Sequence, residues 1–442
     1  MNALKPRLAI VSSHKICCAL AYYADALKDL LSPCFEVEIV DLKTTELLKQ
    51  EGEAYQNLSE AYIDQLCKRL QEFDIVNIHL ELGIFGSSEE LIMSRIIKLC
   101  QASGRLIFTV HTINYKDPHT GHGYVYQQIM QSLKQRPPSN PFHLIAHLPQ
   151  EKALLKQHFD FNNVTDFPLI FLTNERRRFF QQKHNPSTWK KQFNLKEDDI
   201  TIGLFGMLSA HKNYPHALRI LNLLPPNYKL LVIGEAHHMN IKECQVDPVI
   251  QEMVSYLDAH PALSDRVIFT GRRDDAKYYE DLVNIDFVLL PSFEVGQSGS
   301  AVFCTAIELG CPIVKSNNLN SRQYELYFPN CFEVFDIGNH YEAKHKILNF
   351  DRAKLVNLRK KADSFSEVQL QQIYLNIYES MKTHIPVAYS QPAAPAAIKG
   401  NPTPVVEKSP ERIGSIRTIY NQMPRPIQAV LRKVKKTLKL HV

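Results

Sequence analysis

The sequence predicts an α/β protein built from two doubly wound parallel sheets. Three observations support this fold class. Short apolar runs alternate with helical patterns, the two halves of the chain repeat the same plan, and 442 residues with 45% hydrophobic content are enough for two ordinary cores. Ligands of such sheets bind beyond the carboxyl ends of the strands. Functional residues are therefore expected in the loops that follow the strands.

Five buried-strand patterns lie in the first half of the chain, and helical patterns separate them. Two of the expected helices span residues 17–31 and 59–72. A crossover between parallel strands needs a helix of this kind, so the alternation predicts parallel pairing. The expected strands are residues 7–12, 35–40, 75–79, 106–110 and 143–146.

The second half repeats this plan and closes with an amphipathic helix over residues 367–381. The basic and polar segment 176–199 is expected to connect the two halves. We therefore predict two domains, residues 1–178 and 179–383, that face each other across a cleft. The expected strands of the second domain are residues 200–204, 229–233, 267–270, 287–290 and 312–315.

Residues 291–316 are the most informative segment, because they read as strand end, small-residue loop, helix and next strand. The helix is expected over residues 301–309, with Gly310 and Pro312 ending it. Small residues let the backbone approach a ligand, and the first N–H groups of the helix would point at that ligand. Such a loop can hold a diphosphate, and a tight turn without a ligand is the alternative. The loop residues are Ser298, Gly299, Ser300 and Ala301.

This segment resembles the donor-sugar loop of the GT-B glycosyltransferases of group 1, the retaining clan that includes glycogen and sucrose synthases. Ala306, Gly310, Pro312 and Val314 match the family pattern Ala-x-x-x-Gly-x-Pro-Val. The resemblance implies two Rossmann-like domains, with the acceptor held mainly by the first and a nucleoside-diphosphate sugar mainly by the second.

Two glutamates of the family pattern are replaced in this chain. Counted back from Gly310, the second glutamate falls on Thr305 and the first on Gln297, with Glu294 as an alternative for the first. In the family the second glutamate binds the nucleotide ribose. The resemblance therefore implies that these positions contact the donor, with Thr305 beside its ribose.

A second block, TIGLFGMLSAHK at residues 201–212, resembles the family's Gly-Arg-x-x-x-x-Lys element, which neutralises the donor diphosphate without a metal. Gly206 and Lys212 match, and Met207 stands where arginine is common. A fixed lysine and a helix N-terminus can offset the charge of a departing diphosphate. Arg272 or Arg273 is a candidate to replace the missing arginine. No metal and no other cofactor is expected, and a solvated loop lysine is the alternative for Lys212.

Polar side chains at strand ends of the first domain are expected on the acceptor side. The resemblance places His111 against the transferring sugar or the acceptor. Glu81 is expected to orient an acceptor hydroxyl or to accept a hydrogen bond from His111, and His79 shares its strand face. His14 and Lys15 follow the first strand, where they would face the acceptor or the diphosphate. A structurally satisfied side chain is the alternative at each position.

Composition favours a cytoplasmic enzyme. The net charge of +5 is modest and the basic residues are not interleaved with aromatic ones, so nucleic-acid binding is not expected. Nine cysteines at irregular spacings, with Cys17 and Cys18 adjacent, indicate neither a disulfide framework nor a zinc site. No signal peptide and no membrane-spanning run is expected.

The end of the chain carries a separate pattern. Residues 384–412 are rich in proline and alanine, so they are expected to form an extended linker. Residues 413–442 place a stripe of apolar side chains beside many lysines and arginines, which is typical of a helix lying on an anionic membrane. Docking on a protein partner and an unstructured basic tail are the alternatives.

We therefore predict a metal-independent, retaining glycosyltransferase that moves a sugar from a nucleoside diphosphate to a saccharide or lipid-linked saccharide, as in cell-envelope polysaccharide synthesis. Its expected location is the cytoplasm, peripherally at the inner face of the membrane. Two alternatives stay open. One is a non-catalytic binding or scaffold subunit with the same fold, which the replacements at Met207, Gln297 and Thr305 favour. The other is a sugar-nucleotide epimerase.

Overall fold

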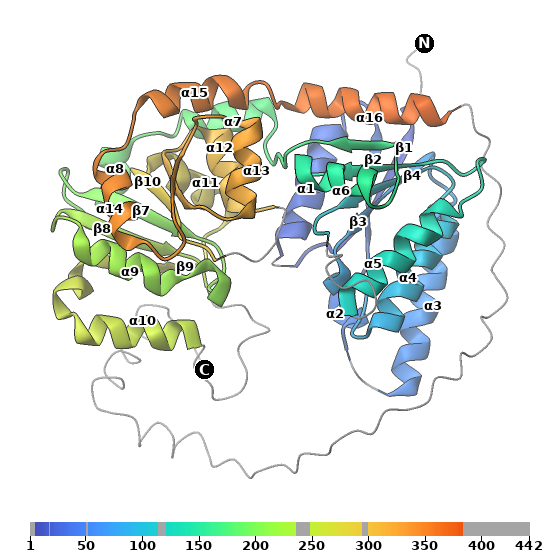
Figure 1. Ribbon diagram of the computed structural model, residues 1–442, viewed down its shortest axis with the longest axis horizontal. Coiled ribbons are helices and arrows are strands. Elements are labelled where there is room, and N and C mark those ends of the chain that lie inside the picture. Colours follow the sequence, from blue (N-terminus) through green and yellow to red (C-terminus); the bar gives the residue numbers. More distant parts are fainter. Residues whose placement is uncertain are drawn as a thin grey trace, which may run out of the picture.

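The computed structural model describes residues 5–16, 18–49, 52–113, 121–235, 248–293 and 299–382. Within these ranges the chain forms two six-stranded sheets, and all strand pairs of both sheets are parallel (Figure 1). This arrangement confirms the predicted fold class of two doubly wound domains. The predicted linker 384–412 and tail 413–442 lie outside the described residues.

The first sheet has the strand order β2-β1-β3-β4-β5-β6. It contains the five expected strands and one further, three-residue strand, β6. Its strands are β1 (Arg7–Ser12), β2 (Glu36–Asp41), β3 (Ile75–Leu80), β4 (Leu106–Val110), β5 (Phe142–Ala146) and β6 (Val164–Asp166). Its helices are α1 (Ala19–Leu31), α2 (Thr44–Leu47), α3 (Glu53–Leu70), η1 (Leu82–Ile84), α4 (Glu89–Ala102), α5 (Gly121–Lys134) and α6 (Pro149–Gln157).

The second sheet has the order β12-β11-β10-β7-β8-β9, again with one more strand, β12, than expected. Its strands are β7 (Ile200–Phe205), β8 (Tyr228–Ile233), β9 (Val267–Gly271), β10 (Phe287–Leu290), β11 (Ile313–Ser316) and β12 (Glu333–Phe335). The helices of this half are α7 (Asn174–Gln181), α8 (Pro186–Lys191), η2 (Ala210–Lys212), α9 (Tyr214–Leu223), α10 (Pro248–Ala259), η4 (Pro261–Arg266), α11 (Asp275–Asn284), α12 (Ala301–Leu309), α13 (Leu319–Tyr327), α14 (His340–Leu348), α15 (Ala353–Ala362) and α16 (Glu367–Met381).

Three apolar clusters hold the layers together. One packs α3, α4 and α5 on the outer face of the first sheet, and another packs α9, α10 and α14 on the second sheet. The third joins α1 and α16 of the first domain to α7, α11 and α12 of the second, so a single core crosses the domain boundary. Because apolar burial stabilises roughly in proportion to area, this shared core resists free separation of the domains.

Helix α16 is the last described element of the chain, yet it packs on the first domain, where Figure 1 shows it lying above α1. The hydroxyl of Tyr374 accepts a hydrogen bond from Asn77 Nδ2 in β3 at 2.9 Å. Gln371 Nε2 donates to the carbonyl of Leu30 at the end of α1, at 2.7 Å. The chain therefore crosses between the domains twice.

The first crossing differs from the expected one. Residues 176–199 were predicted to connect the domains, but they contain α7 and α8, which pack on helices of the second domain. In α8, the indole of buried Trp189 donates to Asp281 Oδ1 at 2.8 Å. The crossing itself is made by residues 167–173, whose side chains at Phe167 and residues 169–172 are buried. That prediction was wrong because polarity was read as exposure.

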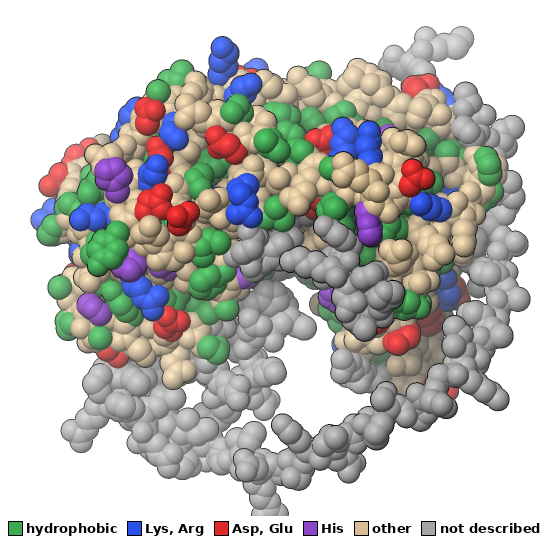
Figure 2. All heavy atoms as spheres, in the orientation of Figure 1, with side chains coloured by type: hydrophobic (Ala, Val, Ile, Leu, Met, Phe, Trp, Pro, Cys, Tyr) green, Lys and Arg blue, Asp and Glu red, His purple; other side chains and the backbone are tan. Residues whose placement is uncertain are grey.

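The surface carries charges of both signs. Acidic and basic side chains are interspersed over the face of both domains that Figure 2 shows, as expected for a modest net charge. Among the helices that the structure describes, none is long and apolar enough to cross a bilayer.

Candidate functional site

A pocket of about 380 Å³ opens at the carboxyl ends of the second sheet. Its walls are the loops after β7, β8, β9, β10 and β11 together with the first turn of α12. The first domain contributes Cys18, Ala19 and Tyr22 at the start of α1, and the crossing segment contributes Phe171. The pocket therefore lies in the cleft between the domains, where ligands of parallel sheets bind.

The floor of the pocket is made by two glycines in close contact. Gly206 follows β7 with φ +99°, a backbone conformation that residues with a side chain rarely adopt. Gly234 follows β8, and a Cβ atom added to it would lie 2.0 Å from the carbonyl oxygen of Gly206. The hydroxyl of Tyr214 donates to the same carbonyl at 2.8 Å. The loop after β7 can take this path only because both positions lack side chains.

Gly234→Ala is therefore expected to destabilise the protein by about 3 kcal/mol, since the new methyl group meets backbone rather than a movable side chain. The change is measured as the free energy of unfolding in urea. Gly83→Ala is the matched control, because nothing lies within 4 Å of a Cβ at Gly83. Equal losses in the two variants would contradict this account of the floor.

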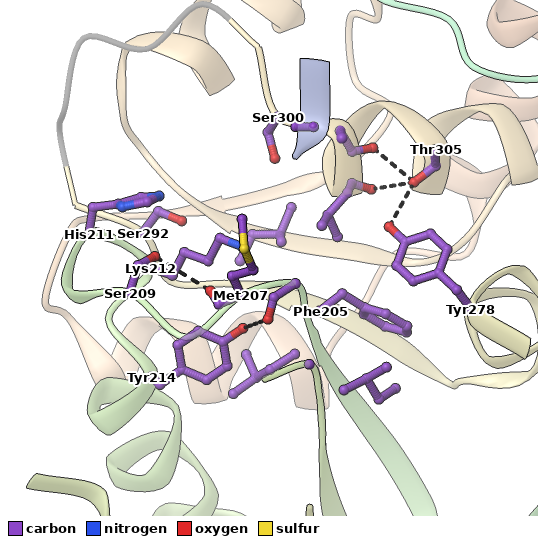
Figure 3. Close-up of a pocket in the computed structure, with 18 of the residues that line it drawn as sticks. Phe205, Met207, Ser209, His211, Lys212, Tyr214, Tyr278, Ser292, Ser300 and Thr305 are labelled. Carbon is purple, nitrogen blue, oxygen red and sulfur yellow. Dashed lines mark hydrogen bonds between the residues drawn. The ribbon is translucent and has the colours of Figure 1, made fainter. Parts of the chain in front are cut away.

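Lys212 supplies a cation beside this floor. A Cβ built on Gly206 would lie 2.3 Å from Lys212 Nζ and 3.6 Å from a methyl of Val302 in α12. Burial lowers the pKa of Lys212 to about 8, and the ammonium has no acidic partner among the described residues. Figure 3 shows Lys212, Met207 and Ser300 directed into the same pocket. A partly buried ammonium of this kind is suited to an anionic ligand.

Helix α12 begins at the same place. Ser300 is its N-cap and accepts a hydrogen bond from the N–H of Phe303 at 3.3 Å, while Ala301 and Val302 line the pocket. Gly299 packs so closely that an added Cβ would lie 2.3 Å from Leu169 of the crossing segment. The helix ends at Gly310 with φ +71°, as the sequence predicted. Its positive N-terminal end therefore faces the pocket that contains Lys212.

Thr305 lies in the next turn of α12 and lines the pocket, but its hydroxyl is turned toward its own helix. Oγ1 donates to the carbonyls of Ala301 and Val302, at 2.9 and 3.1 Å. The hydroxyl of Tyr278 in α11 is 3.3 Å from the same Oγ1 (Figure 3). A threonine here consequently cannot reproduce the two acceptors of a carboxylate.

The two candidate replacements for the missing arginine differ. Arg272 lines the pocket and its guanidinium lies 3.7 Å from Glu235, a second pocket residue, with both side chains partly exposed. Arg273 also lines the pocket, but it donates to both carboxylate oxygens of buried Asp281, at 2.8 and 3.2 Å. Arg273 is thus paired with a carboxylate of α11, and Arg272 is the more adaptable of the two.

Every described residue that was predicted to bind the donor lines this single pocket. They are Gly206, Met207, Lys212, Arg272, Gly299, Ser300, Ala301 and Thr305. The other three, Glu294, Gln297 and Ser298, lie outside the described residues.

The predicted acceptor-side histidines lie in a different environment. His79, at the end of β3, is fully buried, and His111 follows β4 with 8% exposure. The ring centroid of His111 is 5.0 Å from that of His79 and 4.9 Å from that of His147, which follows β5. Tyr23 of α1 touches all three rings at 5.4 to 5.6 Å. These four residues form a buried cluster behind the pocket and none of them lines it.

Burial keeps these imidazoles neutral. It lowers the pKa of His79 to about 3 and of His147 to about 4, and it lowers the pKa of His111 as well. Both ring nitrogens of His79 and Nε2 of His111 and His147 have no hydrogen-bond partner within the part of the chain that the structure describes. The cluster is therefore polar, buried and sensitive to protonation.

The remaining acceptor-side residues lie apart from the pocket. Glu81 accepts a hydrogen bond from Thr112 Oγ1 at 3.2 Å instead of one from His111, and burial raises the pKa of its carboxyl. His14 Nδ1 is 3.4 Å from Asp25 in α1. Lys15 is exposed, with φ +55°.

Three functional candidates escaped sequence reasoning. Lys315 lines the pocket while only 2% exposed, and its Nζ donates to Asn318 Oδ1 at 3.1 Å. The sequence feature that could have revealed it is a lysine within an otherwise apolar strand pattern. His147 stands at a strand end like His111, so the same argument would have found it. Glu308 is a buried acid one turn after Thr305. In the described ranges no group of three or more His, Cys, Asp or Glu side chains could hold a metal ion.

Residues 186–325 match the model of the family described as glycosyl transferases group 1. That stretch contains the loops of β7, β8, β9, β10 and β11 and the whole of α12. This part of the chain is similar to the group 1 glycosyltransferases. No curated protein matches its sequence.

Solved structures resemble this chain over most of its length. HepE from Anabaena, in complex with UDP and glucose, is 14% identical, with a TM-score of 0.62 over 85% of this chain and 100% of HepE. Sucrose-phosphate synthase from Thermosynechococcus elongatus is 15% identical, with a TM-score of 0.59 over 85% and 100%. WaaG, a glycosyltransferase involved in lipopolysaccharide biosynthesis, is 14% identical, with a TM-score of 0.58 over 84% and 99%. At these identities the likeness shows the GT-B fold.

Proposed function

We propose that this protein moves a sugar from a UDP-sugar to the hydroxyl of a saccharide or lipid-linked saccharide. The observation that carries the proposal is the convergence of the Lys212 ammonium and the N-terminal end of α12 on one pocket. Both features favour a negatively charged ligand, and a nucleoside diphosphate is the anion that such a reaction releases. The choice of UDP is supported by HepE, whose structures contain UDP and UDP-glucose.

In the proposed reaction the bond between the anomeric carbon and the diphosphate oxygen breaks, and a bond to the acceptor oxygen forms on the same face of the sugar. The acceptor proton passes to the departing phosphate. Lys212 and the amides of residues 299–301 offset the charge that develops on that phosphate. A protein nucleophile is not needed, and the anomeric configuration is retained.

The proposed reaction requires no metal, because Lys212 and α12 act where a divalent cation would otherwise neutralise the diphosphate. His111 and Glu81 are proposed to act on the acceptor side. Neither side chain lines the pocket, so a direct contact with the acceptor would require the cleft to rearrange.

The acceptor is proposed to belong to a cell-envelope glycan, with the enzyme bound peripherally to the membrane. The likeness to WaaG supports the first part. The composition of residues 413–442 supports the second.

Calorimetry with UDP, GDP, ADP and dTDP, each with and without EDTA, tests the proposal. UDP is expected to bind equally well with EDTA. Release of UDP from UDP-sugars upon addition of mixed saccharides is then expected, while an epimerase would change the sugar without releasing UDP. A protein that binds none of the four nucleotides would be the non-catalytic alternative, which the replacements at Met207 and Thr305 favour.

A further inference from the structure

One buried carboxylate joins the second domain to the crossing segment. Glu308 of α12 is 7% exposed. Its two oxygens accept the N–H of Phe171 at 3.0 and 2.9 Å, and Oε1 also accepts the N–H of Leu172 at 3.0 Å. Residues 171 and 172 lie in no helix or strand, so these hydrogen bonds satisfy buried N–H groups that have no secondary-structure partner.

Opposing effects act on the ionisation of the Glu308 carboxyl group. Burial raises the pKa of Glu308 to about 8, opposed by the N–H groups of Leu172 and Phe171 and by the charges of Arg177 and Arg176 in α7. Because both oxygens receive an N–H group, the ionised form fits this geometry better than the protonated one. An apolar residue would avoid the desolvation but would leave two buried N–H groups without an acceptor.

Phe171 contacts both halves of the molecule. Its side chain lines the pocket. Its ring packs against Tyr23 with a centroid distance of 5.5 Å, and Tyr23 touches all three rings of the histidine cluster. A chain of direct contacts therefore runs from α12, which faces the pocket, through Glu308, Phe171 and Tyr23 to His111.

Neighbouring contacts fix the same segment. Leu169 packs on Gly299, and its N–H lies 3.4 Å from the hydroxyl of Tyr324 in α13. The crossing segment is thus fastened to α12 and α13 at two points, and only the contact at Glu308 uses a carboxyl group.

We infer that Glu308 is a positioning residue for sugar transfer: by fixing Phe171, it sets the first-domain wall of the cleft against the pocket of the second domain. The inference rests on the proposed function. Glu308 would not touch the donor. Its loss should therefore impair turnover much more than nucleotide binding, whose charged contacts lie at Lys212 and the start of α12.

The test compares Glu308→Ala, Glu308→Gln, Phe171→Ala and the double alanine variant in the full chain. Glu308→Ala is expected to lower kcat about 10- to 100-fold, as for a small misplacement of reacting groups, with the Kd of UDP changed less than about threefold. Glu308→Gln keeps one acceptor oxygen and should recover most of the activity. Acting through Phe171, Glu308 should give non-additive effects in the double variant.

Hydrogen exchange gives a readout that is independent of turnover. The amides of Phe171 and Leu172 should exchange at least about tenfold faster in Glu308→Ala than in the unmodified chain. Ile347→Ala, in the buried face of α14 away from the pocket, controls for a general loss of stability and should leave kcat unchanged.

Three results would overturn the inference: an unchanged kcat in Glu308→Ala, equal losses of kcat and UDP affinity, or additive effects in the double variant. If the unmodified chain binds no nucleotide, the proposed function fails instead. Hydrogen exchange then still decides whether Glu308 fixes the segment.

Discussion

Lys212→Ala is expected to lower kcat/KM by about 10²- to 10³-fold, comparable to the loss of one preorganised charge-stabilising group in other enzymes. The reason is the position of the Lys212 side chain in the pocket. Lys212 Nζ is the ammonium beside the pocket floor, in contact range of the position that a Cβ on Gly206 would take. The measurement is UDP release from the matching donor and acceptor pair.

Two variants make this result interpretable. Lys277→Ala removes an exposed lysine of the same domain that does not line the pocket, so it should leave kcat/KM unchanged. Lys212→Arg keeps the charge but changes its shape and reach, so partial activity is expected. Turnover by Lys212→Ala within about twofold of the unmodified enzyme would contradict the assigned role.

The second large expected effect is a loss of folding stability at acidic pH. The histidine cluster should make the protein lose stability as pH falls below about 6.5, the ordinary pKa of histidine. The folded-state pKa of His79 lies at about 3, so below pH 6.5 the unfolded chain binds protons that the folded chain excludes. Stability is therefore complete above pH 6.5 and declines toward pH 3. Between pH 7 and 5 His79 alone accounts for about 2 kcal/mol.

His79→Phe isolates this contribution. The ring still packs against Tyr23, it does not titrate, and no hydrogen bond to a described residue is lost. Urea unfolding at pH 7 and at pH 5 should show the difference between the two pH values shrink by about 2 kcal/mol in the variant. An unchanged difference would mean that the buried imidazole is protonated without cost.

Much of the fold could be predicted from the sequence, because strands of four or more apolar residues and the Gly310-Pro312 helix end are local signals. Shorter elements gave no such signal. Strands β6 and β12 have three residues each, and α7 buries only Phe180 of its eight residues. Their position is set by packing against distant elements, which a local pattern cannot report.

The donor side of the site was predictable for the same reason. Glycines, small residues and a lysine near strand ends are features that one loop contains by itself. The environment of the first-domain histidines was not predictable from the sequence, because a side chain at a strand end can point into a cleft or into the core. Glu308 was missed because its hydrogen-bond partners, Phe171 and Leu172, lie 137 and 136 residues away in sequence.

Helix α16 also bears on the order in which the molecule is made. The first sheet is complete at Asp166, but the helix that covers α1 follows only at residues 367–381. At ordinary rates of synthesis, roughly 10 to 40 s separate the two on the ribosome. During that interval the nascent first domain presents an uncovered apolar surface, which makes it a natural client for chaperones.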